Sequence, residues 1–499
     1  MMNDLLTEKL IQTDVGWHSL PGLFSAMTRG EVQGLPALRP HQRPAWHMFT
    51  VQLAVLALDA AGLRDLPEDE DTWREALLRL TPDAEAWSLV GNPVRPAFLQ
   101  PADPGGLKWT DVTTPDALDM LITSRNHDIK REIAHNAAPQ DWLFALVSLQ
   151  TMEGFGGAGN YGIARMNGGS SSRVLLGLAP ARPGSSDIDP SAWWRRDTLC
   201  LLAGRQGITG KSLIWMEPWP EGRSLNLDEL DPLFIEICRR IRLVQRGGRL
   251  MAQRSTSKAA RIAAKEAMGN TADPWAPIDI AIGKSLTLGD RDFDHDLLVR
   301  LLFAEKPEWK APPLMARTPA EAAAPMLIVA EAIARGNSKT DGFKSRVVPV
   351  PKAMVAQGLF GERPVEVASD LMKDIAAINL ALRNGLATVA AGGDREKLGK
   401  SHYSRAKPAC DAFHRCADAW FFDALWTMAL GKRAEDLRAA RLDFIERLVK
   451  CARAEFEAAL SAIPCASLMR PKAEIRGRQR LESGLHFAMR NLKEESINA

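Results

Sequence analysis

The sequence lacks the patterns that define zinc ribbons, disulfide scaffolds and membrane proteins. Its six cysteines are spread over 499 residues and none forms a CxxC pair, which excludes a zinc ribbon and a thioredoxin-like redox motif. So few cysteines favour reduced thiols in the cytoplasm. The N-terminus has no signal-peptide pattern, and the apolar segment 48–63 is too short to span a membrane. We therefore expect a cytoplasmic protein with no membrane partner.

An overall excess of charge is also absent. Lys and Arg total 63 and Asp and Glu total 61, so the formal net charge is +2. This balance excludes a global polycation and a strongly acidic chain. Any affinity for nucleic acid must therefore come from local clusters of Lys and Arg. The length is about three times the ~150 residues of a typical domain, so more than one compact core is expected.

The distribution of helical and strand-like segments predicts the domain organisation. The first 150 residues are mainly helical, and short strand-like runs follow between about 173 and 305. After residue 363, four segments carry apolar residues at helical spacing, which is typical of a helix bundle. These segments are 365–391, 408–430, 434–463 and 472–495. We predict an α+β fold with a large mixed domain over residues 1–362 and a four-helix bundle over 363–499.

Positive charge is concentrated in residues 237–265, which hold nine basic side chains and no acidic one. Gly247 and Gly248 separate two strand-like runs within this segment, which indicates a hairpin with a two-residue turn. Two interpretations stay open: contact with a nucleic-acid backbone, or a solvated face with acidic neighbours from elsewhere in the fold. The candidate phosphate contacts are Arg239, Arg240, Arg242, Arg246, Arg249, Arg254 and Lys258.

Glycine is concentrated in residues 154–169, where it fills seven of sixteen positions. A phosphate-binding P-loop needs a preceding strand and a following GK[ST]. Here a predicted helix precedes the segment and no such motif follows, so a P-loop is excluded. The segment is either a loop whose backbone approaches a nucleic-acid groove or simply a flexible loop.

An enzyme is the main alternative from another class. A metal-dependent nuclease could use His127, Asp128 and His135, but these residues show no HxxxH spacing and no second ligand cluster is evident. The chain also has no GxSxG and no zinc-deaminase signature. Together these absences favour a binding protein with no catalytic residues, no metal and no cofactor. A purely structural assembly subunit is the third alternative.

Several separated segments resemble one known family when they are taken together. They are residues 5–49, the glycine segment GFGGAGNYGIARMNGGSSSR at 154–173, IARGNSKTDGFKSRVVPV at 333–350, and the terminal helical bundle. In their order and spacing they resemble the CasA family, the large subunits of the type I-E CRISPR Cascade surveillance complex. The resemblance covers nearly the whole chain.

This resemblance implies a non-catalytic DNA-recognition subunit. Family members recognise the protospacer-adjacent motif on double-stranded DNA from the minor groove, promote strand separation and R-loop formation, and recruit a helicase-nuclease. In this family the target sequence itself is recognised by base pairing with the guide RNA. The implied partners are other Cascade subunits, guide RNA, the target duplex and its displaced strand, and no homo-oligomer is expected.

The family's functional elements can be placed on this sequence by the same resemblance. The glycine loop and lysine finger correspond to Gly156, Gly157, Ala158 and Lys284. The strand-separating wedge corresponds to Asn337, Ser338 and Lys339, although the glutamine of better-known members is missing between 335 and 344. A loop that docks near the guide's 5′ handle corresponds to Asn126, His127, Asp128, Lys130 and Arg131. The cysteine-rich zinc insertions of some relatives are missing, so no zinc is expected.

Overall fold

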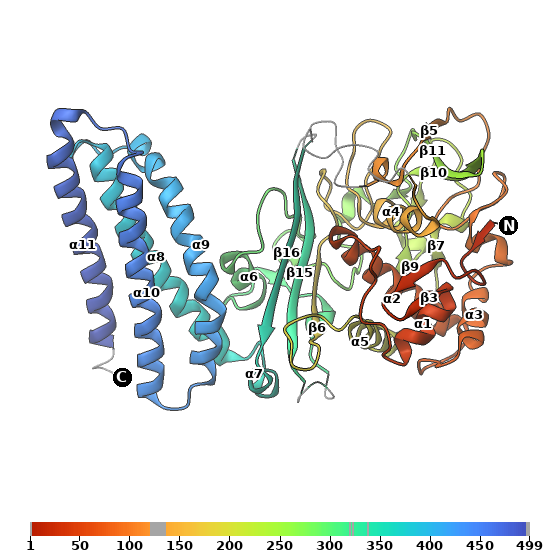
Figure 1. The fold of residues 1–499 in the computed structure, drawn as a ribbon, viewed down its shortest axis with the longest axis horizontal. Coiled ribbons are helices and arrows are strands. Elements are labelled where there is room, and N and C mark those ends of the chain that lie inside the picture. The colour runs from red at the N-terminus through yellow and green to blue at the C-terminus, as the bar shows by residue number, and fades with distance from the viewer. Residues whose placement is uncertain (1, 120–135, 319–320, 322–323, 337–338, 496–499) are drawn as a thin grey trace. The chain divides into compact units, whose positions relative to one another are not determined.

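The chain folds into two compact units (Figure 1). The computed structural model describes residues 2–119, 136–318, 321, 324–336 and 339–495. Unit 1 comprises Met1–Phe293 and Glu308–Pro349, and unit 2 comprises Asp294–Pro307 and Val350–Ala499. Unit 2 thus begins before the boundary after residue 362 that the sequence suggested, and it includes a short segment from the middle of the chain.

Helix α2 (Arg43–Ala60) forms the centre of unit 1. Every residue from Pro44 to Leu58 is buried, and Pro44 occupies the first turn, where a missing amide hydrogen costs nothing. Three other helices of the unit pack directly against α2. They are α3 (Glu70–Leu78), α4 (Pro139–Met152) and α5 (Pro190–Leu202), and α1 (Leu20–Thr28) packs on α3 and α5. The apolar segment 48–63, which is too short to span a membrane, thus lies mostly within this buried helix.

A three-stranded antiparallel sheet contains the basic hairpin. Its strand order is β10 (Arg240–Arg246), β11 (Arg249–Ser255) and β5 (Thr110–Val112). Arg246 lies opposite Arg249, and Gly247 and Gly248 between them have φ of 56° and 77°. Positive φ at both turn residues matches the right-handed twist of the flanking strands, and glycine adopts it without steric cost. The predicted hairpin is confirmed.

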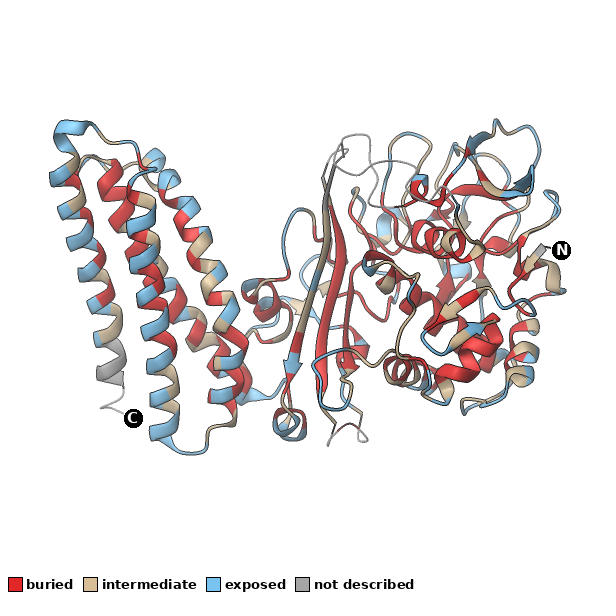
Figure 2. Ribbon diagram, in the orientation of Figure 1, coloured by how far each residue is buried: buried red, intermediate tan, exposed pale blue. Residues whose placement is uncertain are grey.

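A second three-stranded sheet contains a long hairpin (Figure 1). Strand β15 (Met326–Gly336) lies between β16 (Lys339–Val350) and β6 (Leu175–Pro180). Residues 326–334 of β15 are all buried (Figure 2), as expected for a central strand. Two-stranded ladders complete unit 1. They are β1 (Met2–Asp4) with β4 (Ser88–Val90), β2 (Ile11–Thr13) with β3 (Gly16–His18), β7 (Lys211–Leu213) with β9 (Leu230–Ile235), β8 (Leu225–Asn226) with β12 (Ile262–Ala263), and β13 (Ile278–Asp279) with β14 (Trp309–Lys310).

Unit 2 contains the predicted run of four long helices. They are α8 (Glu362–Ala390), α9 (Lys400–Leu430), α10 (Ala434–Leu460) and α11 (Arg470–Glu495). Helix α9 begins eight residues before Pro408, where the sequence predicted its start, and the proline lies inside the helix. An internal proline removes one backbone hydrogen bond but does not end this helix. Among the described helices, none combines the length and apolar character needed to cross a membrane.

The short helices α6 (His295–Leu302) and α7 (Lys352–Gln357) also belong to unit 2 and pack against α9. The backbone amide of His295 donates to Asp418 of α9 at 2.7 Å. The ring of Phe303 lies 6.0 Å from that of Trp426. These contacts explain why Asp294–Pro307 folds with the bundle.

One buried carboxyl group makes the stability of unit 1 depend on pH. Glu236 is only 3% exposed, and one carboxylate oxygen accepts a hydrogen bond from the amide of Ala164 at 2.7 Å. Its other oxygen has no partner among the described residues. Burial raises the pKa of Glu236 to about 7, against the attraction of Arg165. A carboxyl with a raised pKa binds its proton more tightly in the folded state, so its contribution to stability falls as pH rises.

We predict that Glu236→Gln flattens the pH dependence of the unfolding free energy between about pH 4.5 and 7. In this window the folded wild-type protein holds a proton that the unfolded chain releases, so wild-type stability falls with rising pH. The glutamine side chain of the variant cannot ionise and lacks this contribution. Urea denaturation of both proteins across the window measures it. A stability difference between them that is the same at both ends would contradict the prediction.

Candidate nucleic-acid interface

The carboxylate of Glu153 joins three segments that the sequence analysis singled out separately. Glu153 directly follows α4 and precedes the glycine segment. Its Oε2 lies 3.4 Å from Nη2 of Arg239, at the start of the basic hairpin. Its Oε1 accepts from Nη1 of Arg335, near the end of β15, at 2.7 Å. The glycine loop, the basic hairpin and the β15–β16 hairpin therefore share one buried anchoring group.

The glycine segment is held by backbone hydrogen bonds and is not a loose loop. The amide of Gly154 donates to the carbonyl of Ser171 at 3.1 Å, and that of Phe155 donates to Gly169 at 2.7 Å. The hydroxyl of Ser171 donates in turn to the carbonyl of Ile333 on β15 at 2.9 Å. The two ends of the segment thus close on each other and on the sheet, which does not favour the flexible-loop interpretation.

Only part of the predicted glycine-loop motif presents unused amides. The amide of Gly156 already donates to the carbonyl of Asn160 at 2.9 Å. Within the described part of the chain, the amides of Gly157 and Ala158 donate to no group. Gly157 has φ of +109° and nothing within 4 Å of the position of an added Cβ, so its backbone is open to an approaching ligand. The hydrogen-bond donors that this loop can offer to a ligand are therefore the backbone amides of Gly157 and Ala158.

The glycine loop packs against the segment that follows β11. A Cβ added to Gly159 would lie 2.7 Å from Cβ of Thr256, so only glycine allows this close approach. The amide of Ser257 donates to the carbonyl of Gly159 at 3.0 Å, and the Tyr161 hydroxyl donates to the carbonyl of Lys258 at 3.1 Å. The exposed side chain of Lys258 therefore starts beside the glycine loop.

Three of the predicted phosphate contacts are buried inside unit 1. Arg239, Arg240 and Arg242 are 6%, 1% and 3% exposed. The guanidinium of Arg240 lies 4.2 Å from the ring centroid of Trp219 and donates to that residue's carbonyl at 2.9 Å. These positions contradict the expectation that Arg240 and Arg242 project from a binding face. The burial of these three arginines also contradicts the alternative interpretation, in which they would lie on a solvated face.

The Arg242 guanidinium binds the connection after β4. It donates to four backbone carbonyls, those of Gly91, Asn92, Arg95 and Pro101, at 2.9–3.3 Å. Burial lowers the pKa of Arg242 to about 10, so it still carries its charge at neutral pH. Its function here is to satisfy carbonyls that would otherwise be buried without donors, and this argues against a phosphate contact.

The remaining four predicted phosphate contacts are exposed. Arg246 forms an ion pair with Asp111 of β5 at 2.7 Å. Arg249, Arg254 and Lys258 form no ion pair with any described residue. Three cations without counter-ions on one hairpin and its continuation provide local positive charge that the net charge of +2 conceals.

Lys284 closes a tight turn at residues 279–284. The carboxylate of Asp279 accepts from the amides of Ala281 and Ile282 at 2.9 and 3.2 Å, and the amide of Asp279 donates to the carbonyl of Lys284 at 2.8 Å. The side chains of Ile280 and Ile282 are 56% and 50% exposed. The turn therefore presents a half-exposed lysine beside two exposed apolar side chains.

The turn lies against the far end of the glycine segment. Ser285, which follows Lys284, donates its amide to the carbonyl of Met268 at 3.0 Å. The residue after Met268, Gly269, packs so closely that an added Cβ would lie 2.7 Å from the amide nitrogen of Asn167. Because Asn167 belongs to the glycine-rich segment, these contacts join the Lys284 turn to the far end of that segment.

Several predicted site residues lie outside the described residues. They are Asn126, His127, Asp128, Lys130 and Arg131 of the predicted docking loop, His135, and Asn337 and Ser338 of the predicted wedge. Lys339 is the first residue of β16. Glu153 and Arg335 were not among the site residues expected from the sequence. The position of Glu153 between an apolar helix and the glycine run was the signal in the sequence.

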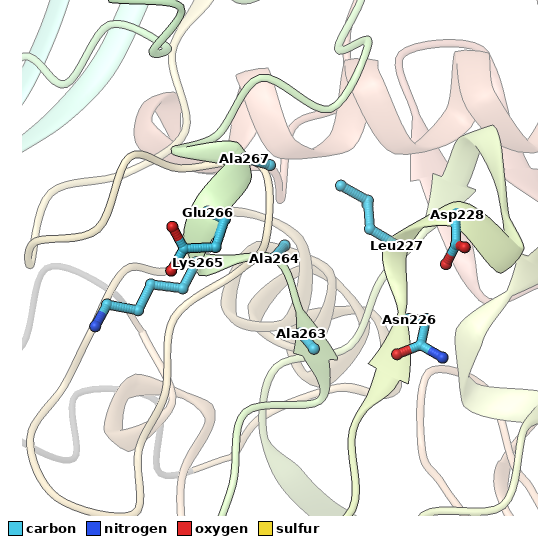
Figure 3. A pocket seen from close by; sticks show the side chains of 8 residues that line it. All are labelled: Asn226, Leu227, Asp228, Ala263, Ala264, Lys265, Glu266 and Ala267. Atoms are coloured by element: carbon cyan, nitrogen blue, oxygen red, sulfur yellow. The ribbon is translucent and has the colours of Figure 1, made fainter.

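A surface hollow lies at the ends of the paired strands β8 and β12 and is lined also by the residues that follow them (Figure 3). Asn226, Leu227 and Asp228 line one side, and residues 263–267 line the other. Lys265 extends away from Asn226 and Asp228 (Figure 3). With one cation and two carboxylates, the lining does not concentrate positive charge and is separate from the elements joined at Glu153.

We predict that Arg242→Ala lowers the free energy of unfolding by about 2–4 kcal/mol, because it leaves several buried carbonyls without donors. Arg249→Ala is the matched control, since it removes an exposed arginine of the same hairpin and should change stability by less than about 0.5 kcal/mol. Chemical denaturation followed by circular dichroism measures both. Equal stability of the two variants would show that Arg242 is not structural.

Comparison with known proteins places the whole chain in one fold. No protein-family model and no curated protein matched it. Among solved structures, Cse1 of Acidimicrobium ferrooxidans is 18% identical with a TM-score of 0.66, and each chain is covered to 99%. CasA (Cse1) of Thermus thermophilus is 17% identical with a TM-score of 0.64 over 97% of this chain and 99% of that one.

A third structure, Thermobifida fusca Cse1, is 16% identical with a TM-score of 0.61 over 98% of this chain and 100% of that one. A chain of a structure described as "CRISPR RNA-guided surveillance complex" is also similar, with 14% identity and a TM-score of 0.59. The likeness includes both the mixed N-terminal part and the run of helices α8–α11. Over nearly its whole length, this chain has the fold of the Cse1/CasA proteins.

Proposed function

We propose that this chain is the large subunit of a CRISPR RNA-guided surveillance complex. In this role it recognises the protospacer-adjacent motif on double-stranded DNA, promotes strand separation and R-loop formation, and recruits the helicase-nuclease. The full-length likeness to Cse1/CasA structures carries the proposal. Its partners are the other Cascade subunits and guide RNA, a role supported by the similar chain in a surveillance complex.

The proposed motif contacts are hydrogen-bond donors, which suits the minor groove. That groove presents mainly acceptors, N3 of adenine and O2 of thymine, together with the amino group of guanine. The amides of Gly157 and Ala158 and the ammonium group of Lys284 are the candidate donors: the first two lie in the glycine loop, and the third lies on the turn joined to the other end of the glycine-rich segment. Gly156 offers no free donor, since its own amide is already bonded, and an added Cβ at this position would lie 3.2 Å from Nη2 of Arg239.

The proposed phosphate contacts are the exposed cations of the basic hairpin and its continuation. Arg249, Arg254 and Lys258 would bind the DNA backbone and fix its position without selecting a sequence. Lys258 is the cation next to the glycine loop, so one duplex could be bound by its phosphates and its groove together. Arg246 would contribute less, because Asp111 already neutralises it.

The proposed wedge comprises Asn337, Ser338 and Lys339, which follow β15 in the sequence. Its support is the anchoring of the hairpin, since Arg335 pairs with Glu153 and Ile333 accepts from Ser171. A wedge must resist the force of strand separation, and these contacts connect it to the motif-binding loop. The docking loop at 126–131 remains a proposal from the family resemblance.

We predict that Lys284→Ala weakens binding of the assembled complex to a motif-bearing duplex by roughly tenfold to a hundredfold, the loss expected for one charged hydrogen bond. Affinity for a duplex without the motif should change much less. Lys9→Ala, which removes an exposed lysine outside these elements, is the control. Equal affinity of Lys284→Ala and Lys9→Ala for the motif-bearing duplex would contradict this assignment. Motif-independent binding by the wild-type complex would support a purely structural subunit instead.

We predict that the double variant Arg249→Gln/Arg254→Gln weakens binding to all duplexes alike. Each lost phosphate contact should reduce the slope of log K against log salt by about one unit, so the double variant should lose about two. Arg79→Gln, at an exposed arginine after α3, is the control. Binding isotherms at several salt concentrations give the slopes, and an unchanged slope would exclude these phosphate contacts.

A further inference from the structure

A cluster of three metal-ligating side chains lies within the helical bundle of unit 2. The sulfur atoms of Cys416 and Cys451 and a carboxylate oxygen of Glu455 all lie within 4.8 Å of one another. Cys416 belongs to α9, whereas Cys451 and Glu455 belong to α10. It is the single group of three or more such ligands found in the described part of the chain.

The spacing along α10 explains how two of the ligands face the same point. Residues four apart on a helix lie on one face, one turn from each other, so Cys451 and Glu455 both project towards α9. Cys416 lies fifteen residues before Gly431, which caps the end of α9. Cys451 lies eighteen residues after Arg433, which caps the start of α10. The two cysteines therefore meet near the middle of an antiparallel helix pair.

We propose that Cys416, Cys451 and Glu455 bind a zinc ion that bridges α9 and α10, with a fourth position open to solvent. Two thiolates and one carboxylate suit zinc, which is commonly bound by Cys and Asp or Glu in tetrahedral geometry. Zinc–sulfur bonds of about 2.3 Å place two sulfurs roughly 3.8 Å apart. The ligand atoms already lie within 4.8 Å of one another, so only a small adjustment of the side chains would be needed to reach this separation.

The surroundings of the cluster leave its ligands free for a cation. Both cysteines are free thiols, and Glu455 forms no ion pair with any described residue. The neighbouring charges on α10 are already used, since Arg453 pairs with Glu482 and Glu457 pairs with Arg478. Glu455 is the acidic residue of this stretch that lacks such a partner among the described residues.

The cluster is largely shielded from bulk water. Cys451 is 7% exposed, and the side chains of Cys416 and Glu455 are half-buried. A thiol that coordinates a divalent cation loses its proton, so zinc binding at this site should release protons to solvent.

The test uses the full chain with a thiol-free reductant, which keeps Cys416 and Cys451 reduced. Cobalt(II) is titrated into the metal-free protein, and thiolate coordination is detected as a sulfur-to-cobalt charge-transfer band that zinc then abolishes. We expect one equivalent of metal, release of protons on binding, and a zinc-dependent rise in the thermal unfolding midpoint.

Variants assign the ligands. Cys416→Ser, Cys451→Ser and Glu455→Gln should each lower cobalt affinity by at least about tenfold, the lower end of the loss seen even for outer-sphere partners. Cys465→Ser, at a cysteine outside the cluster, is the matched control and should bind as wild type. Glu455→Gln replaces a half-buried side chain, so it keeps both thiols and tests the site without disturbing the core.

Two results would overturn the proposal. One is the absence of a charge-transfer band when cobalt(II) is added to the reduced wild-type protein. The other is equal cobalt affinity in Cys451→Ser, Glu455→Gln and Cys465→Ser.

Discussion

The arrangement of the candidate interface depends on one carboxylate shared by two arginines. Glu153 lies between Arg239 and Arg335, which come from segments separated by nearly a hundred residues of sequence. Removing one member of such a buried group leaves an uncompensated charge, which costs far more than an exposed pair is worth. The glycine loop, the basic hairpin and the β15–β16 hairpin are thus held by the same carboxylate, so the position of each one restricts the positions of the others.

The basic segment shows how one run of charge can serve two physical purposes. At its start, Arg240 and Arg242 bind backbone carbonyls and the face of Trp219, in places where lysine could not supply a planar set of donors. After the turn, the cations reach solvent. The change occurs along β10 itself, whose first four residues are buried and whose last two are exposed. Charge density in a sequence therefore does not distinguish a core guanidinium from a surface one.

Local patterns predicted the elements of the fold well. The apolar segment around α2, the Gly247–Gly248 turn and the four long helices follow from periodicity and turn chemistry, which depend on neighbours in sequence. The burial of Arg242 could not be predicted, because its carbonyl partners lie about 150 residues away. The start of α9 was also missed, since Pro408 usually marks a first turn. The pairing of Glu153 with Arg335 is likewise long-range.

The assignment of Asp294–Pro307 to the helical unit has a consequence for dissecting the protein. The backbone passes between the two units three times, after Phe293, after Pro307 and after Pro349. No single cut can release an intact bundle: a fragment that starts at Val350 lacks α6, and it exposes the face of α9 near Trp426 that Phe303 covers. A fragment ending at Pro349 carries α6 without the helix it packs on. Truncation therefore cannot separate the two units cleanly, and a faithful excised bundle would need α6 grafted back through an artificial linker.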